Sequence, residues 1–297
     1  MAAYAQQLLV CTGQRDWTSR IEDDGQGESW GALVRGLKGL LGRGGQFADP
    51  YNNILITNSS FAPSPPPPTN PSGREKTMAS AFLFPSFKYF PSIPTHPPST
   101  PTTPTTTTED ANLSTFVQAH LLPETSRFGG PTRRPELAAA LPADAIDWVH
   151  SPVVLICGHG GRDMRCGVMA GALEAEFQSV LREHGFAVPS SGEVGDREDE
   201  NGAPQIDRPD RAHVGLISHI GGHKYAGNVI VYIPPGMRAV GEDSVSIPHP
   251  LAGKGIWYGR IEPKHVRGVV KETVLGGRVI ADHFRGGVDR ESGILRL

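Results

Sequence analysis

The chain has 297 residues, which is enough for one large domain or for two small domains and their linkers. Its 28 Lys and Arg residues nearly balance 31 Asp and Glu residues, for a formal net charge of -3, so electrostatics favours neither nucleic acid nor an anionic membrane as a partner. Three cysteines are too few for a secreted disulfide scaffold, and no apolar run is long enough to span a membrane.

The first sixty residues predict a strand, a helix and a second strand. The run LLVCTGQRDW starts as an apolar strand and continues into a turn that carries Cys11. The stretch ESWGALVRGLKGLL indicates a helix, and NNILITN indicates a strand. Met1 stands only a few residues before the first strand, and no targeting peptide is visible there. We expect residues 1–61 to form the N-terminal half of the protein.

Residues 62–108 are rich in proline and threonine. Such tracts bury too little apolar surface to offset the entropy lost on ordering, so they predict an extended linker. Within the linker, the segment 79–93 (ASAFLFPSFKYFPSI) contains five aromatic residues. We expect this apolar segment to pack on a neighbouring domain.

The clearest secondary-structure pattern lies in residues 109–297. The β-rich run PVVLIC, residues 152–157, is typical of a buried strand. Apolar residues then recur every four positions from Met169 to Leu181, which predicts a helix that begins near Gly167. A polar, acidic loop follows before the next strand.

Three strands and a last helix complete this region. The runs HVGLIS, NVIVYIP and GIWYGRI predict strands, and EPKHVRGVVKETVLGG predicts a helix with Pro263 in its first turn. The order β-α-β-β-β-α is typical of a thioredoxin-like α/β layer. Strand, cysteine-bearing turn, helix and strand also occur in residues 1–61, so the sequence predicts an internal duplication whose N-terminal copy is degenerate.

Chemically reactive residue types gather in two glycine-rich segments, each directly after a predicted strand. CGHGGRDMRCG contains Cys157 and Cys166, and HIGGHKYAGN contains His219 and His223. Loops that follow strands gather at the carboxyl edge of an α/β sheet. A lone buried thiol or loop histidine is more often structural, but two pairs in this arrangement indicate a metal or cluster site, and the ligand set suits zinc or an iron–sulfur centre.

Several known classes of cysteine site share parts of this pattern. A phosphatase loop needs five residues between Cys and Arg, whereas only four separate Cys157 from Arg162, and a thioredoxin-type redox pair needs C-x-x-C. The eight-residue spacing does not exclude a Cys157–Cys166 disulfide that closes a longer loop. His159, in C-x-H, is a rival ligand of the Rieske kind, although the C-x-x-H partner motif is missing. The wide C-x8-C spacing disfavours structural zinc without excluding it.

The segments CGHGGRDMRCG, SHIGGHKYAGNVIVYIP, GIWYGRIEPKHVRGVV and VLGGRVI resemble the sucrase/ferredoxin-like proteins. The resemblance covers roughly residues 1–57 and 110–285. It implies that residues 109–297 are a thioredoxin-like ferredoxin domain that binds a 2Fe–2S cluster through two cysteines and two histidines. By position these ligands are Cys157, Cys166, His219 and His223. The Pro/Thr tract departs from the family pattern as an insertion.

Residues next to the four expected ligands are candidates for supporting roles. His159 and Asp163 are expected to hold a ligand or its loop, and Arg162, Arg165 and Lys224 to add positive charge; for each cation, a solvated loop charge is the equal alternative.

We therefore expect an electron carrier or redox protein more than a stand-alone enzyme. One alternative is a thiol oxidoreductase that cycles through a Cys157–Cys166 disulfide, and another is a structural zinc module that serves as an interaction platform. The expected partners are redox proteins, with no nucleic acid and no membrane span. The family resemblance suggests work on thiol homeostasis in the mitochondrion, with the cytoplasm as the alternative location.

Overall fold

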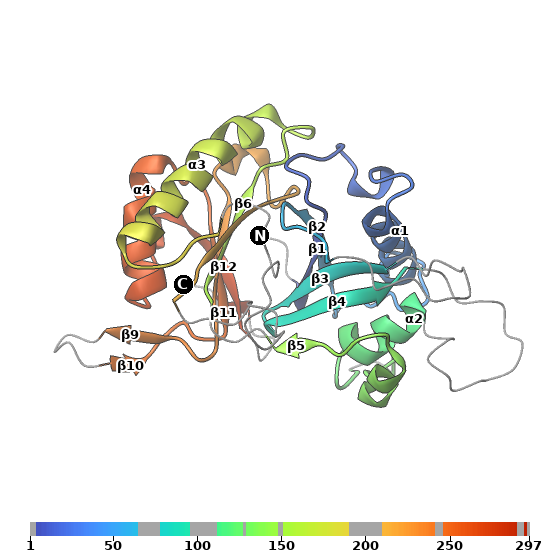
Figure 1. Cartoon of the computed structure of the whole chain (residues 1–297). Helices are drawn as coiled ribbons and strands as arrows, with labels where there is room; N and C mark the ends of the chain where they lie inside the picture. The colour runs from blue at the N-terminus through green and yellow to red at the C-terminus, as the bar shows by residue number, and fades with distance from the viewer. Residues whose placement is uncertain are drawn as a thin grey trace, which may run out of the picture.

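The computed structural model describes residues 4–64, 78–95, 112–126, 129–147, 151–189, 210–240, 246–289 and 294–295. Within them lies one mixed α/β fold around an 11-stranded sheet (Figure 1). The strand order is β13-β12-β11-β8-β6-β7-β2-β1-β3-β4-β5. Strands β1 to β5 form one half of this sheet, and the other half consists of β6, β7, β8, β11, β12 and β13. No helix among the described residues is long and apolar enough to cross a membrane.

The first group of elements extends well beyond residue 61. It consists of β1 (Gln6–Cys11), α1 (Ser29–Leu41), β2 (Ile54–Ser59), β3 (Met78–Phe84), β4 (Lys88–Pro94), α2 (Leu113–Phe116) with a π-helical turn over Val117–Leu121, and β5 (Ile146–Asp147). Strands β1 and β2 are parallel, and β3 and β4 continue the sheet in antiparallel pairs on the other side of β1.

The second group repeats this topology. It consists of β6 (Val153–Cys157), α3 (Met164–Glu183), β7 (His213–Ile217), β8 (Val229–Ile233), β11 (Lys254–Tyr258), α4 (Pro263–Val269) with a π-helical turn over Val270–Leu275, β12 (Phe284–Asp289) and β13 (Ile294–Leu295). Strands β6 and β7 are parallel, and β8 and β11 continue in antiparallel pairs. A separate hairpin, β9 (Arg238–Val240) and β10 (Ser246–Pro248), follows β8.

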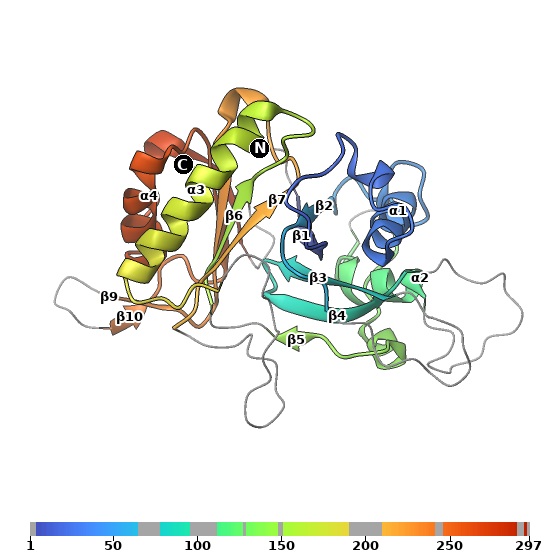
Figure 2. The same cartoon turned by 45° about the horizontal axis from the view of Figure 1, so that its top comes forward.

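The two groups meet where β2 pairs antiparallel with β7, through Ser59 and Ile217. The hydrogen bonds at this junction are nearly symmetric. The amide of Asn58 donates to the Ser218 hydroxyl at 3.0 Å, and the amide of Leu216 donates to the Ser60 hydroxyl at 3.0 Å. Each serine directly follows its strand, so the junction relates equivalent positions of the two groups. Figure 2 shows β2 and β7 close together between the two sets of helices.

The apolar segment that we placed inside a linker forms the hairpin β3–β4, inserted into the sheet beside β1. Its rings also contact the second group: Phe84 stacks on Tyr232 of β8 with ring centroids 4.2 Å apart, and Phe87 lies edge-on to the same ring at 6.2 Å. The expected packing on neighbouring structure is therefore present. The proline-rich tracts that flank the hairpin lie largely outside the described residues.

Helix boundaries differ from the sequence prediction at one functionally relevant place. Helix α3 begins at Met164, three residues before the predicted start at Gly167, because the Asp163 side chain accepts a hydrogen bond from the Arg165 amide at 2.9 Å and caps the helix. Cys166 therefore lies inside the first turn of α3. Helix α4 starts at Pro263, as predicted, and the valine face of the helix is buried.

Candidate metal centre

The candidate centre lies at the carboxyl edge of β6 and β7. These neighbours are parallel, and Cys157 at the end of β6 pairs with Ile217 at the end of β7. The loops that follow the two strands therefore leave the sheet at the same edge. The first loop leads to Cys166 in α3, and the second carries His219. The cysteine loop and the histidine loop meet, as predicted, because the parallel register of β6 and β7 ends both strands at the same level.

Three potential ligand atoms converge there. The atoms offered by Cys157, Cys166 and His219 all lie within 4.8 Å of one another, and the Cys157 sulfur lies 4.0 Å from Nδ1 of His219. Both thiols are free, and their residues are buried, whereas His219 is half-buried. In tetrahedral metal sites with bonds near 2.3 Å, neighbouring ligand atoms are about 3.8 Å apart, so these three donors fit around a thiophilic metal.

The two thiols differ electrostatically. The pKa of Cys157 is lowered to about 4, first because the Cys166 thiol donates to its sulfur, and further because His219 and the Ile220 amide do so. The pKa of Cys166 is raised, because its proton is held by the Cys157 thiolate and because the thiol is buried. Without metal, the pair therefore holds one thiolate and one thiol. A bound cation would replace the shared proton and favour two thiolates.

His223, the fourth expected ligand, begins a short 3-10 helix, His223–Tyr225, on the same loop as His219. Its side chain lies outside the described part of the structure, so its role as a ligand stays a prediction. The loop turns at Gly221, whose φ of +75° lies in the region that glycine adopts readily.

His159, the rival ligand, uses both ring nitrogens elsewhere. Its Nδ1 accepts a hydrogen bond from the backbone amide of His219 at 2.8 Å. Its Nε2 must then carry the proton, which it donates to the Thr18 carbonyl at 2.7 Å. The ring is buried. His159 thus fixes the backbone of His219 and joins it to the N-terminal loop.

The charged neighbours named from the sequence are mostly engaged with one another or with backbone. Arg162 donates to the Ser19 carbonyl at 2.9 Å. Arg165 forms an ion pair with Asp163, with Nε and one terminal nitrogen at 3.0 Å and 2.7 Å from the carboxylate oxygens. Lys224 lies over the Tyr225 ring, 5.0 Å from its centroid.

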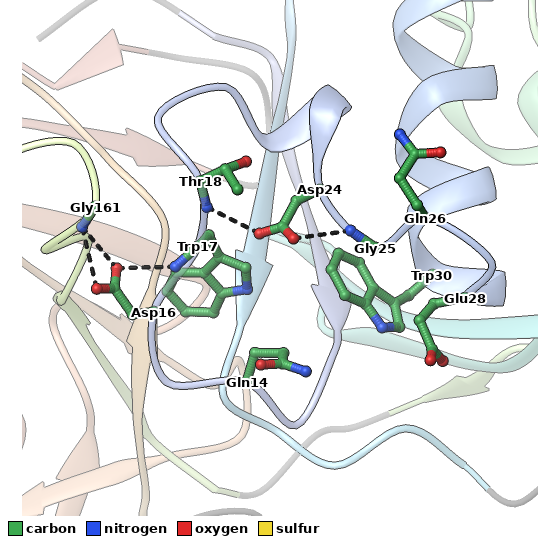
Figure 3. A pocket seen from close by; sticks show the side chains of 10 residues that line it. All are labelled: Gln14, Asp16, Trp17, Thr18, Asp24, Gly25, Gln26, Glu28, Trp30 and Gly161. Atoms are coloured by element: carbon green, nitrogen blue, oxygen red, sulfur yellow. Dashed lines mark hydrogen bonds between the residues drawn. The ribbon is translucent and has the colours of Figure 1, made fainter.

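The loop after β1 is a part of the site that the sequence prediction missed. Both carboxylate oxygens of Asp16 accept from the Gly161 amide, at 3.0 Å and 3.1 Å, in the middle of the cysteine loop. Figure 3 shows Asp16 reaching toward Gly161 beside an open pocket of about 600 Å³ whose lining includes Trp17 and Trp30. In the sequence, LLVCTGQRDW can be laid on VLICGHGGRDM with one gap, which indicates that the two loops are equivalent.

The equivalent place in the first group cannot form the same centre. Cys11 ends β1 as Cys157 ends β6, but Phe61 stands two residues after β2, where His219 stands two residues after β7. Burial raises the pKa of Cys11 to about 12, which keeps this thiol protonated. The first group of elements supports the cysteine loop through Asp16 and Thr18.

A model of the sucrase/ferredoxin-like family matches residues 1–286. The protein named altered inheritance of mitochondria protein 32 from Clavispora lusitaniae is 34% identical over 192 residues, which are 59% of this chain and 52% of that protein. Its namesake from Meyerozyma guilliermondii is 31% identical over 189 residues, 61% of this chain and 52% of that protein.

A relative with a different name is actin patches distal protein 1 of Saccharomyces cerevisiae, 31% identical over 122 residues, 41% of this chain and 29% of that protein. The chain spans about half the length of the first two relatives. No solved structure matches the chain.

Proposed function

Because the chain belongs to the sucrase/ferredoxin-like family, we propose that it is an electron-transfer protein with a 2Fe–2S cluster held by Cys157, Cys166, His219 and His223. The observation that carries the proposal is the convergence of two thiols and an imidazole from two loops, one after β6 and one after β7. Such a cluster would take up and release one electron.

The surroundings of the thiols favour a cluster over a single zinc ion. The wide cysteine loop folds back so that Gly160 lies against Gly167. A Cβ added to Gly167 would come within 2.8 Å of the Gly160 Cα. Backbone amides can approach sulfur in such a loop, and the Ile220 amide already donates to Cys157. Hydrogen bonds of this kind stabilise the negative charge on cluster sulfurs.

Two imidazole ligands give a cluster with two fewer negative charges than four thiolates. Adding an electron is then easier, so we expect a reduction potential above the roughly -400 mV of plant-type ferredoxins. His219 is half-buried, whereas both cysteines are buried, and this side of the centre is therefore the natural exit for an electron.

We further propose that both groups of strands and helices are thioredoxin-like units that arose by duplication. In each unit the sheet order is second, first, third and fourth strand, with a parallel first pair and antiparallel additions. The first unit then extends through β3, β4 and α2, and the ferredoxin unit begins with β6. The nearly symmetric junction at Ser60 and Ser218 supports this division.

A thiol oxidoreductase is the second candidate. Its support is the closeness of the Cys157 and Cys166 sulfurs and the lowered pKa of Cys157, since a thiolate is the nucleophile of disulfide exchange. A structural zinc module is the third, because the same three donors suit zinc.

The names of the two fungal relatives refer to mitochondrial inheritance. On this ground we propose that the protein acts in thiol and redox homeostasis of the mitochondrion, with the cytosol as the alternative compartment. Redox proteins that give and take electrons would be its partners.

One preparation separates the three candidates. Protein purified without oxygen should show visible charge-transfer absorption and contain two iron and two sulfide ions per chain. Colourless protein with one zinc ion would support the zinc module. Colourless, metal-free protein in which Cys157 and Cys166 form a disulfide would support the oxidoreductase.

A further inference from the structure

Asn228 is a fully buried residue beside the candidate centre, and the proposed function does not yet use it. Its Nδ2 has no hydrogen-bond partner among the described residues, although its exposed fraction is 0%. A buried N–H without an acceptor costs about 1–3 kcal/mol, so such groups call for an explanation.

Strand pairing places Asn228 next to a ligand. The Cys157 amide donates to the Asn228 carbonyl at 3.0 Å, and the adjoining pair of the β6–β8 ladder is Ile156 with Val229. Cys157 and Asn228 are therefore opposite each other. In antiparallel sheets, directly opposite side chains lie on the same face with Cβ atoms about 4.5–5.5 Å apart.

Arg285 on β12 sets the orientation of the amide. Its guanidinium donates to Oδ1 of Asn228, and because arginine has no acceptor, the oxygen must be the atom on that side. Strand β12 lies two strands beyond β8, on the side away from β6. An Oδ1 that faces β12 leaves Nδ2 on the side of the amide that faces β6, the strand that Cys157 ends.

Arg285 is itself held in place. Its guanidinium lies 3.9 Å from the Tyr225 ring centroid. The histidine loop also closes on it, since a Cβ on Gly221 would come within 2.5 Å of an Arg285 nitrogen and 3.3 Å of Asn228 Oδ1. Asn228 and Arg285 thus contact the loop that carries both His219 and Tyr225.

We propose that the Asn228 side-chain amide donates a hydrogen bond to sulfur of the centre, at Cys157 or at a bridging sulfide, and that Arg285 holds it in this orientation. This inference rests on the proposed 2Fe–2S cluster and adds a residue that sets its reduction potential. A donor to sulfur stabilises the reduced, more negative state, and the Arg285 charge acts in the same direction.

The test compares reduction potentials of variants that contain equal amounts of iron and sulfide. Asn228→Leu should make reduction about tenfold less favourable, a shift of about 59 mV to lower potential for one electron. Asn228→Asp keeps an acceptor for Arg285 but has no amide donor, so its reduction potential should also be lower than that of the wild type. This variant provides the test if Asn228→Leu does not fold. Arg285→Met should lower the potential as well.

A buried asparagine in the other half provides the matched control. Asn58 is fully buried, and its side-chain atoms Oδ1 and Nδ2 have no hydrogen-bond partner in the part of the chain that the structure describes. It pairs with Val10, whose side chain is in the core on the opposite face of the sheet from Cys157. Asn58→Leu removes an equivalent amide and should leave the potential unchanged.

A second readout is independent of the potential. In reduced protein with 15N in its asparagine side chains, pulsed EPR should show a weak 15N coupling that persists in Asn58→Leu and disappears in Asn228→Leu. Unchanged potential and coupling in a fully loaded Asn228→Leu protein would overturn this inference alone. Wild-type protein without iron and sulfide would overturn the proposed function as well.

Discussion

In the proposed centre Cys157 and Cys166 would each supply a thiolate, whereas the remaining cysteine, Cys11, ends a strand of the other half. We predict that Cys157→Ala and Cys166→Ala lose nearly all iron and sulfide. Cys11→Ala is the control: it also removes a buried thiol, but Cys11 lies outside the converging donors, so this variant should retain both iron and sulfide. His219→Cys should keep a cluster, held by three cysteines and His223, since cysteine thiolate is the commonest ligand of such clusters. Iron and sulfide analysis of the purified variants tests this prediction. A full iron content in Cys157→Ala or Cys166→Ala would show that the replaced cysteine is not a ligand.

The thiol pair predicts an unusual titration in reduced, metal-free protein. The pKa of Cys157 is lowered to about 4, while those of Cys166 and Cys11 are raised. A group with a lowered pKa stays charged above that value, so one thiolate per chain should persist from about pH 5 to pH 8 and be lost as the pH falls through about 4.

Thiolate absorbance near 240 nm measures this titration. The plateau should be absent from Cys157→Ser and present in Cys11→Ser. Thiolate that appears only above about pH 8, as for an ordinary cysteine, would contradict the described thiol pair.

At the scale of elements, the loop after β1 supports the cysteine loop. A Cβ on Gly161 would lie 2.2 Å from the Trp17 carbonyl, so Gly161→Ala must push the two loops apart. We predict a lower melting temperature and reduced iron content for this variant. Gly171→Ala is the control, because Gly171 is exposed in α3 with open space around it. It should stabilise the protein by about 0.5–1 kcal/mol. Equal behaviour of the two variants would show that the loops do not depend on each other.

The order of the second group was predictable because its strands and helices have strong patterns of their own. The runs that predict β6, β7, β8 and β11 are short and apolar, and α3 and α4 have one apolar face each. Strand β12 was missed: its sequence is FRGGVD, in which two glycines weaken any strand pattern, and it forms through pairing with β11. The hairpin β3–β4 was assigned to a linker because proline-rich tracts flank it on both sides.

The sequence predicts the part of the site that lies in the two loops directly after β6 and β7. The two loops after β6 and β7 contain Cys157, Cys166 and His219, and the parallel register brings them together. Asp16 and Arg285 lie in other segments, which only the tertiary structure places beside these loops. Asn228 ends the segment HIGGHKYAGN, but its position opposite Cys157 depends on the antiparallel register of β6 and β8, which the sequence does not show.

At the scale of the whole molecule, the aromatic contact between the hairpin and β8 joins the two halves. Phe84 is fully buried and stacks on Tyr232, and the Tyr232 hydroxyl lies 3.0 Å from that of Tyr4. We predict that Phe84→Ala lowers the free energy of unfolding by about 3–5 kcal/mol. Tyr51→Ala, at a position that is 66% exposed, should change it by less than about 0.5 kcal/mol.

Urea unfolding followed by tryptophan fluorescence measures both variants, because Trp30 lies in the first half and Trp257 in the second. A Phe84→Ala midpoint equal to that of Tyr51→Ala would mean that the hairpin does not hold the halves together.

The most direct test of the account is pulsed EPR of the wild-type protein after one-electron reduction. A 2Fe–2S cluster with histidine ligands predicts strong coupling of the unpaired electron to directly bound 14N. His219→Cys should remove the part of that coupling which belongs to His219. A cluster signal without any strongly coupled nitrogen would contradict the ligand set, and the absence of a paramagnetic signal from fully reduced protein would contradict the cluster itself.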